Sequence, residues 1–146
     1  MNLDDDIIAD INLAREILSI EDYSIVVISY GKILNHKKGD GVKPFMQIID
    51  ELGNDLEGKV IGDRILGKAS AFLCRYSNVK GVYSPQATKT AIAILIIGGI
   101  PCQTDEMIPF IKNRKGDGLC PFENMLQDVE YPEDAYKILN ENVIRD

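Results

Sequence analysis

The sequence predicts an α/β protein, a three-layer α/β/α sandwich built on a mixed sheet. Three features support this: an amphipathic helix opens the chain, a hairpin of two short strands follows it, and a later strand runs directly into a helix. Helical and strand patterns then alternate to the end, without repeats. At 146 residues, the chain has the length of one domain, residues 1–146, with its own apolar core.

The first half of the chain gives the clearest local patterns. Residues 4–18 begin with three aspartates at the positive end of the helix dipole and carry one helical stripe of apolar residues: Ile7, Ile8, Ile11, Ala14, Ile17 and Leu18. Residues 24–29 and 32–36 read as strands joined at Tyr30-Gly31, which predicts an antiparallel hairpin. A helix follows from about Pro44, since proline at the first helical position loses no hydrogen bond.

In the centre, apolar residues at helical spacing predict a helix over residues 62–76, with Asp63 at its N-cap and Gly67-Lys68 in its interior. Residues 79–83 then read as a strand that enters a helix over 86–97 through Ser84-Pro85. One further strand and two proline-started helices, from Pro121 and Pro132, complete the chain.

Composition narrows the classes of function. The net charge of −7 is spread along the chain, so no nucleic-acid partner is expected. The longest apolar run, residues 91–97, is far shorter than the ~20 residues of a membrane span. An acidic N-terminus and three cysteines without a CxxC pair, at positions 74, 102 and 120, predict a cytoplasmic protein with reduced thiols.

The order of elements resembles the cytidine-deaminase-like fold. The stretches "GDRILGKASAFL", "VYSPQA" and "LCPFE" together resemble an uncharacterised bacterial and archaeal family of that superfamily that lacks its zinc chemistry. The resemblance extends from the hairpin to Glu123. It implies a pocket at the helix starts and no established activity.

Zinc deaminases open one helix with H-x-E and a later one with P-C-x-x-C. The resemblance matches these openings to Asp63-Arg64-Ile65 and to the segment from Pro85, which puts Gln86 and Lys89 at the positions of the thiolates. An amide and an amine cannot replace two soft anionic ligands. We therefore expect no metal and no cofactor.

Several residues are candidates for binding a ligand. Asp63 either faces the ligand or only caps its helix. Gly67 allows a close approach, and Lys68 either binds an anionic group or extends its stem along the core to water. Gly41 and Lys43 belong to a lysine-rich glycine loop that is an anion cradle or a solvated turn.

Cys120 and Glu123 form the sharpest candidate pair. A thiol at a helix start can ionise, and a carboxylate three residues later can move protons. The alternative is a proline-started helix in which Glu123 has a capping role. Cys74 and Cys102 fall in a helix and a strand and are expected in the core.

Three functional hypotheses remain open. The first is a small-molecule binding protein with a nucleoside-like or nucleotide-like ligand, whose pocket includes Asp63, Lys68, Ser84, Gln86 and the 120–123 turn. The second is a zinc-independent enzyme using Cys120, with Glu123 or Asp63 as the proton shuttle. The third is a non-catalytic interaction protein or homo-oligomer.

Overall fold

The computed structural model describes residues 4–113 and 115–146, which form a single succession of helices and strands. In chain order these are α1 (Asp5–Ile20), β1 (Ile25–Ser29), β2 (Lys32–Lys37), α2 (Lys43–Leu52), the 3₁₀ turn η1 (Gly53–Leu56), β3 (Val60–Asp63), β4 (Ile65–Leu66), α3 (Lys68–Tyr76), β5 (Gly81–Thr88), α4 (Lys89–Ile97), β6 (Cys102–Ile108), α5 (Pro121–Met125) and α6 (Pro132–Asn142).

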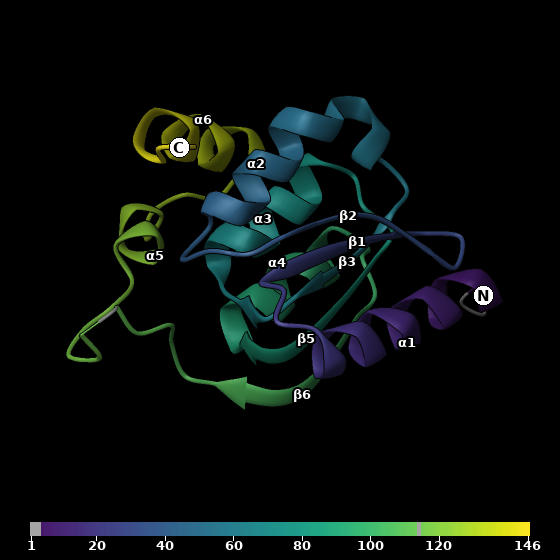
Figure 1. Cartoon of the computed structure of the whole chain (residues 1–146). Coiled ribbons are helices and arrows are strands. Elements are labelled where there is room, and N and C mark those ends of the chain that lie inside the picture. The colour runs from purple at the N-terminus through teal and green to yellow at the C-terminus, as the bar shows by residue number, and fades with distance from the viewer. Residues whose placement is uncertain (1–3, 114) are drawn as a thin grey trace.

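The strands form one mixed six-stranded sheet (Figure 1). β1 pairs antiparallel with β2 on one side and with β3 on the other. β5 runs parallel to β3, to β4 and to β6, which forms the edge. The carboxyl ends of β3, β5 and β6 therefore lie at the same end of the sheet, where α3 and α4 begin and where Figure 1 shows α5.

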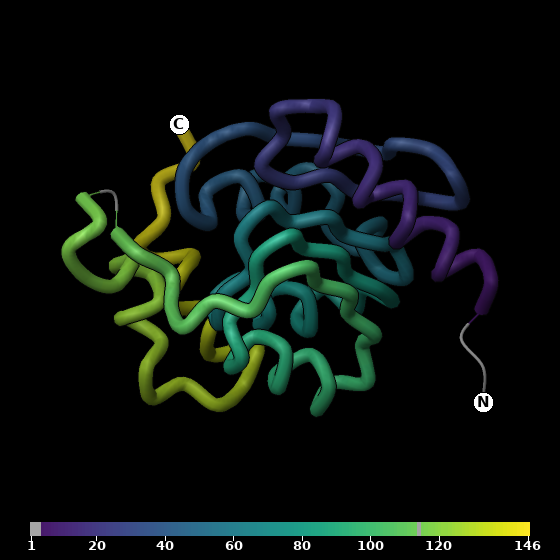
Figure 2. The backbone as a smooth tube through the Cα atoms, turned by 90° about the horizontal axis from the view of Figure 1, so that it is seen from below, coloured from purple at the N-terminus to yellow at the C-terminus, as the bar shows by residue number. Residues whose placement is uncertain are grey.

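Helices cover both faces of the sheet, as predicted for three layers. The larger core lies on the face of α2, α3, α4 and α6 and includes Phe45, Phe72 and Leu139. The smaller core lies between α1 and the other face, around Ala14, Val26 and Tyr83. Figure 2 shows α1 and α4 on opposite sides of the strands.

The predicted helix over residues 62–76 is wrong in its first six residues. Residues 60–63 form β3, Ile65 and Leu66 form β4, and only Lys68–Tyr76 is helical. Both strands pair with β5 in one register, because Gly62 lies opposite Tyr83 and Ile65 opposite Gln86. Asp63 is thus the last residue of a strand and not an N-cap, and Gly67 is the N-cap position rather than a helix interior.

The predicted strand over 79–83 is too short, and α4 begins three residues later than expected. β5 continues through Pro85 to Thr88, whose hydroxyl oxygen caps α4 by accepting from the N–H of Ala91 at 3.1 Å. Pro85 is tolerated because the pairing with β3, β4 and β6 skips it. Gln86 therefore lies in the strand, and Lys89 is the first residue of the helix.

Asp10 ties α1 to the hairpin. Its side chain is buried and accepts hydrogen bonds from the backbone N–H groups of Tyr30 at 3.1 Å and Gly31 at 2.8 Å. Both turn residues have positive φ, the geometry of a two-residue hairpin turn, so these N–H groups point out of the ladder.

Asp10→Ala is therefore expected to lower the free energy of unfolding by about 1–3 kcal/mol, because two backbone donors lose a charged acceptor. Urea denaturation measures the change. Glu16→Ala, an exposed acid on the same helix, is the control. Equal stability of the two variants would contradict the assignment.

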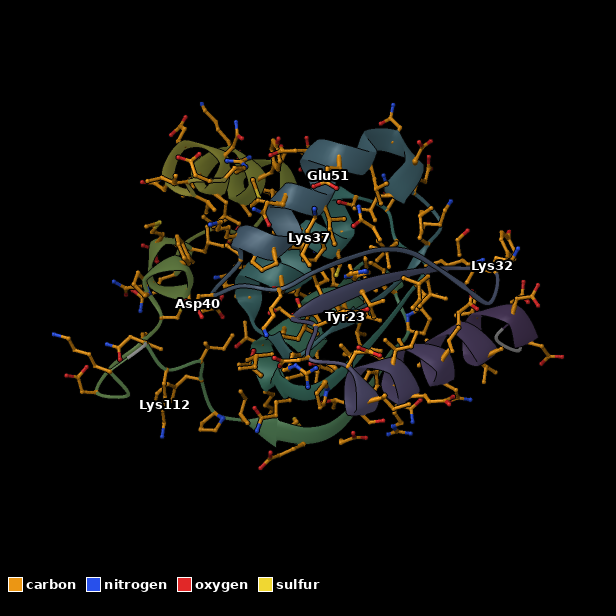
Figure 3. The ribbon with its side chains drawn as sticks, viewed as in Figure 1. Tyr23, Lys32, Lys37, Asp40, Glu51 and Lys112 are labelled. Carbon is orange, nitrogen blue, oxygen red and sulfur yellow. The ribbon has the colours of Figure 1, made fainter. Side chains whose placement is uncertain are left out.

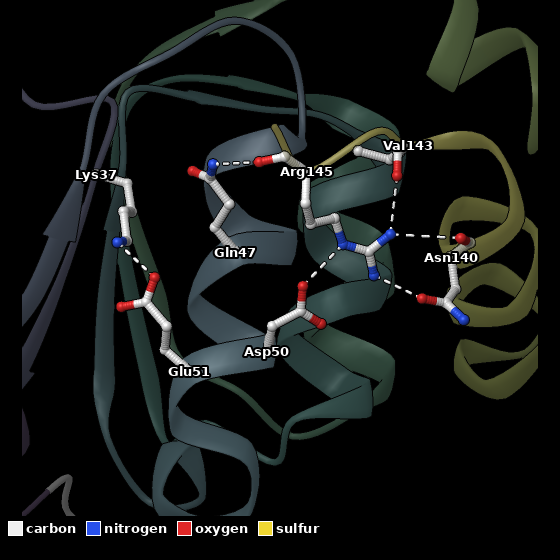
Figure 4. Close-up of polar contacts among 7 residues, drawn as sticks. All are labelled: Lys37, Gln47, Asp50, Glu51, Asn140, Val143 and Arg145. Atoms are coloured by element: carbon white, nitrogen blue, oxygen red, sulfur yellow. Dashed lines mark hydrogen bonds and ion pairs between the residues drawn. The ribbon is translucent and has the colours of Figure 1, made fainter.

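The last residues of the chain are held against α2 (Figure 4). Arg145 Nε donates to the Asp50 carboxylate at 2.9 Å, and Gln47 donates to the Arg145 carbonyl at 2.8 Å. Lys37 on β2 forms an ion pair with Glu51 of α2, and Figure 4 shows these two side chains directed toward one another. Within the described ranges, no helix is long and apolar enough to cross a membrane.

Candidate functional site

A row of polar side chains crosses three parallel strands, from the last residue of β3 to the middle of β5 and of β6. Gly62 pairs with Tyr83 and Ser84 pairs with Thr104, so the next residue of β3, Asp63, lies beside Ser84. The alternation of side chains along each strand directs all three toward the face that α3 and α4 cover. Ligands of open α/β sheets bind at this end of the strands.

Asp63 is the charged group of this row. Its residue surface is 9% exposed, and burial raises the pKa of its carboxyl to about 7. Hydrogen bonds from the Ser70 hydroxyl and the Ile65 backbone N–H favour the ionised form and lower the pKa, while the nearby Glu123 carboxylate raises it. Near neutral pH, Asp63 can therefore either donate or accept a hydrogen bond.

Glu123 reaches the same place from α5. Its two carboxylate oxygens accept from the backbone N–H groups of Lys68 at 2.6 Å and Ala69 at 2.8 Å, which are the first two residues of α3. A Cβ atom on Gly67 would lie 2.1 Å from the Glu123 Oε1 atom and 2.3 Å from the Cδ1 atom of Ile111. The close approach that Gly67 permits is thus to the carboxylate of another element.

The structure brings Asp63, Gly67, Lys68 and Glu123 together around the start of α3. Lys68 directs its ammonium to the Gln127 carbonyl at 2.9 Å and passes 5.9 Å from the ring centre of Phe72. This is the extended stem expected of a lysine at the margin of an apolar face.

The remaining predicted residues have other surroundings. Ser84 is fully buried and donates to the Gln86 carbonyl at 2.7 Å, while the Gln86 amide donates to Glu106 at 2.9 Å. A Cβ on Gly41, where φ is +60°, would lie 2.9 Å from the Phe122 ring. Lys43 donates to the Asp146 carbonyl.

The lysine-rich loop before α2 has its cations engaged within the chain. Lys37 pairs with Glu51 and Lys38 with Asp22, in addition to the contact of Lys43. Figure 3 shows Asp40 of this loop on the side of α5. These contacts support the reading of this loop as a turn more than as an anion cradle.

Two polar residues near Asp63 and Ser84 were not predicted. Ser70 bonds the Asp63 carboxylate from the first turn of α3, and Thr104 continues the row on β6, where its hydroxyl donates to the Glu106 carbonyl at 3.3 Å. In a strand over residues 102–108, successive side chains point to opposite faces, so Thr104 shares the face of Cys102. Only the sheet register places Thr104 next to Ser84.

A second polar cluster lies on the opposite face, between α1 and β6. The Tyr83 hydroxyl donates to the Asp105 carboxylate at 2.5 Å, and Arg15 pairs with the same carboxylate while lying 5.2 Å from the Tyr83 ring centre. These groups line a groove of about 540 Å³ with Arg64 and Pro85. Arg64 is bound there by three backbone carbonyls, including that of Leu18 at 3.0 Å.

The three thiols differ in their environment. Cys74 is fully buried, and burial raises its thiol pKa well above the usual value. Cys102 is partly buried, and the same effect raises its pKa to about 11. Cys120 lies half-buried at the start of α5.

We expect Cys120 to react first with iodoacetamide, because burial shields Cys74 and Cys102 and raises their thiol pKa values above the usual value, which leaves little thiolate. Timed alkylation of the native protein with mass-spectrometric mapping measures the three rates. The variant Cys120→Ser is the control that assigns the alkylation rate of Cys120. Faster labelling of Cys102 than of Cys120 would contradict this ranking.

The fold defines the class of protein: an α/β chain with helices on both faces of a mixed six-stranded sheet. The family model of TM1506, a domain of unknown function (DUF1893), matches residues 13–143, so the chain belongs to this family. The crystal structure of a DUF1893 family protein (TM1506) from Thermotoga maritima superposes with a TM-score of 0.85 at 25% identity, covering 97% of this chain and 93% of that one.

Other solved structures are similar at lower identity. RibD from Acinetobacter baumannii (form 1) gives a TM-score of 0.52 at 12% identity, over 68% of this chain and 35% of RibD. The dCMP deaminase from cyanophage S-TIM5 gives 0.45 at 13% identity, over 73% of this chain and all of that one, 100%. No curated protein sequence matches this chain.

Proposed function

We propose that this protein binds a small polar molecule of nucleoside-like shape where β3 ends beside β5 and β6, in a deaminase-like pocket without zinc ligands. The observation that carries the proposal is the row formed by Asp63 and Ser84, which are buried, and by the partly exposed Thr104. A carboxyl with a pKa of about 7 beside two hydroxyl groups can match both donors and acceptors of a heterocycle.

The residues at the two helix starts do not fit a zinc ion. α3 begins with Gly67, Lys68 and Ala69, and α4 with Thr88 and Lys89, none of which is a usual zinc ligand. The Glu123 carboxylate fills the space into which a side chain at position 67 would project. Among the residues that the structure describes, no three His, Cys, Asp or Glu side chains are grouped to hold a metal ion.

The alternative of a thiol-dependent enzyme has less support. Both Glu123 oxygens accept hydrogen bonds from the start of α3, which engages this carboxylate away from a role as base for Cys120. Asp63 is bound to Ser70 and Ile65.

The free thiols agree with a reducing compartment, and we include a cytoplasmic location in the proposal.

A thermal-unfolding screen with free bases, nucleosides, nucleotides and sugar phosphates tests the proposal. A ligand at about 100 times its Kd is expected to stabilise the wild type by about 2.7 kcal/mol. Asp63→Ala should lose this stabilisation. Asp105→Ala, on the same sheet but the opposite face, should keep it. A ligand that stabilises the Asp63 variant equally would refute the proposed position.

A further inference from the structure

The start of α3 already holds an anion, and that anion belongs to the protein. Helix N-termini offer unpaired backbone N–H groups and a positive dipole end, and they commonly receive phosphates. Here the N–H groups of Lys68 and Ala69 both donate to the Glu123 carboxylate, at 2.6 and 2.8 Å.

Residues before and after Glu123 in the chain hold its carboxylate in this position. Phe122 packs against the backbone of Gly41, and the fully buried Leu126 anchors the residues that follow. The Lys68 ammonium donates to the Gln127 carbonyl at 2.9 Å. Gly67 leaves the necessary space, because any Cβ at this position would collide with the carboxylate.

The charges beside the polar row are negative. Asp63 and Glu123 interact electrostatically, and within residues 4–113 and 115–146 neither carboxylate forms an ion pair. Lys68, the first residue of α3, directs its ammonium to a backbone carbonyl. A phosphate in this position would meet carboxylates and would find the two helix N–H groups occupied.

We propose that Glu123 is a specificity-determining residue, which restricts the pocket to uncharged, hydrogen-bond-donating nucleosides or bases and excludes their phosphates. This inference rests on the proposed function. Glu123 acts by occupying the backbone donors that a phosphate requires and by adding a negative charge at the same place.

The experiment compares the wild type with Glu123→Ala, Glu123→Gln and the control Glu130→Ala, an exposed acid that removes the same charge elsewhere. Calorimetry at constant ionic strength measures binding of inorganic phosphate, and of cytidine and adenosine against their 5′-monophosphates. The alanine variant should bind phosphate at least about tenfold more tightly than the wild type or the control. The wild type should prefer each nucleoside over its monophosphate.

Each outcome bears on one of the two proposals. Equal phosphate affinity in wild type and Glu123→Ala would overturn the role of Glu123, whether or not nucleosides bind. If the wild type binds a nucleoside and its monophosphate equally, the selectivity fails while the proposed function stands. If no base, nucleoside or nucleotide binds, the proposed function fails, and the phosphate measurement still decides on Glu123. Should the alanine variant lose its cooperative unfolding transition, the nearly isosteric glutamine variant gives the phosphate comparison.

Discussion

Replacing Asp63 by asparagine is expected to stabilise the folded protein at pH 8 and to remove most of its loss of stability between pH 4 and 7. Asparagine keeps an oxygen that can accept from Ser70 and from the Ile65 N–H, and it has no charge to bury. The gain at pH 8 is of the order of 4 kcal/mol, the upper bound for a pKa that is about three pH units higher in the folded state.

The direction follows from proton binding. The folded carboxyl has a pKa of about 7, and the unfolded one has the ordinary value of 3.8. Between these values the folded state holds a proton that the unfolded state has lost, so stability falls as pH rises through this window and is constant above it. Asp22, Glu51 and Asp105 have lowered pKa values and act in the opposite sense, as pH falls below about 4.

Urea denaturation of both proteins from pH 4 to 8 measures the effect, and the difference between the two curves isolates Asp63 from the other acids. Asp128→Asn, an exposed acid near α5, serves as the control. Parallel curves for wild type and Asp63→Asn would contradict the buried, protonated carboxyl.

Gly67→Ala is expected to lower the free energy of unfolding by about 2–4 kcal/mol. The new methyl group would lie 2.1 Å from the Glu123 carboxylate and 2.3 Å from Ile111, so both must move. Overpacking of this kind costs about 1–3 kcal/mol, and loss of the helix cap adds about 1 kcal/mol.

Gly118→Ala is the matched control, since its methyl group would meet only Asn113 at 3.4 Å. In the double variant Gly67→Ala/Glu123→Ala, the two costs should not add, because removing the carboxylate relieves the larger clash. Additive free energies in this cycle would show that Gly67 and Glu123 act independently.

Elements with a local signal at each end were predicted to within two residues. The first helix has aspartates at its start, the hairpin has Tyr30-Gly31 at its turn, and α5 and α6 begin at the expected prolines. In each case the deciding interaction is formed by residues that are neighbours in the sequence.

The prediction failed where sheet pairing decides the structure. Ile65 and Leu66 fit a helical stripe together with Ala69 and Phe72, yet they pair with β5 as a strand. Gly67, which is the N-cap position of α3, was the only local indication that the helix begins there. Pro85 indicated a helix start but lies inside β5, and only the positions of the neighbouring strands explain why this is tolerated.

The sequence analysis singled out candidate residues but did not predict how they lie relative to one another. Asp63, Gly67, Lys68 and Glu123 were each singled out, and they lie together because α5 caps α3 across more than fifty positions of sequence. One of the two alternatives for Glu123 was a capping role on its own helix, whereas its carboxylate accepts from the start of α3. The pKa of Asp63 depends on burial by distant elements, which no local pattern contains.

The separation of the apolar interior into two cores has a consequence for how the molecule opens. The sheet stands between them, and α1 alone covers the smaller one, held by Asp10 at the hairpin and by Arg64 at its last turn. Detachment of α1 would leave the larger core and the row at Asp63 covered by their own helices. We therefore expect α1 to be a separate cooperative unit, whose amides exchange with solvent through a partial opening below the free energy of global unfolding.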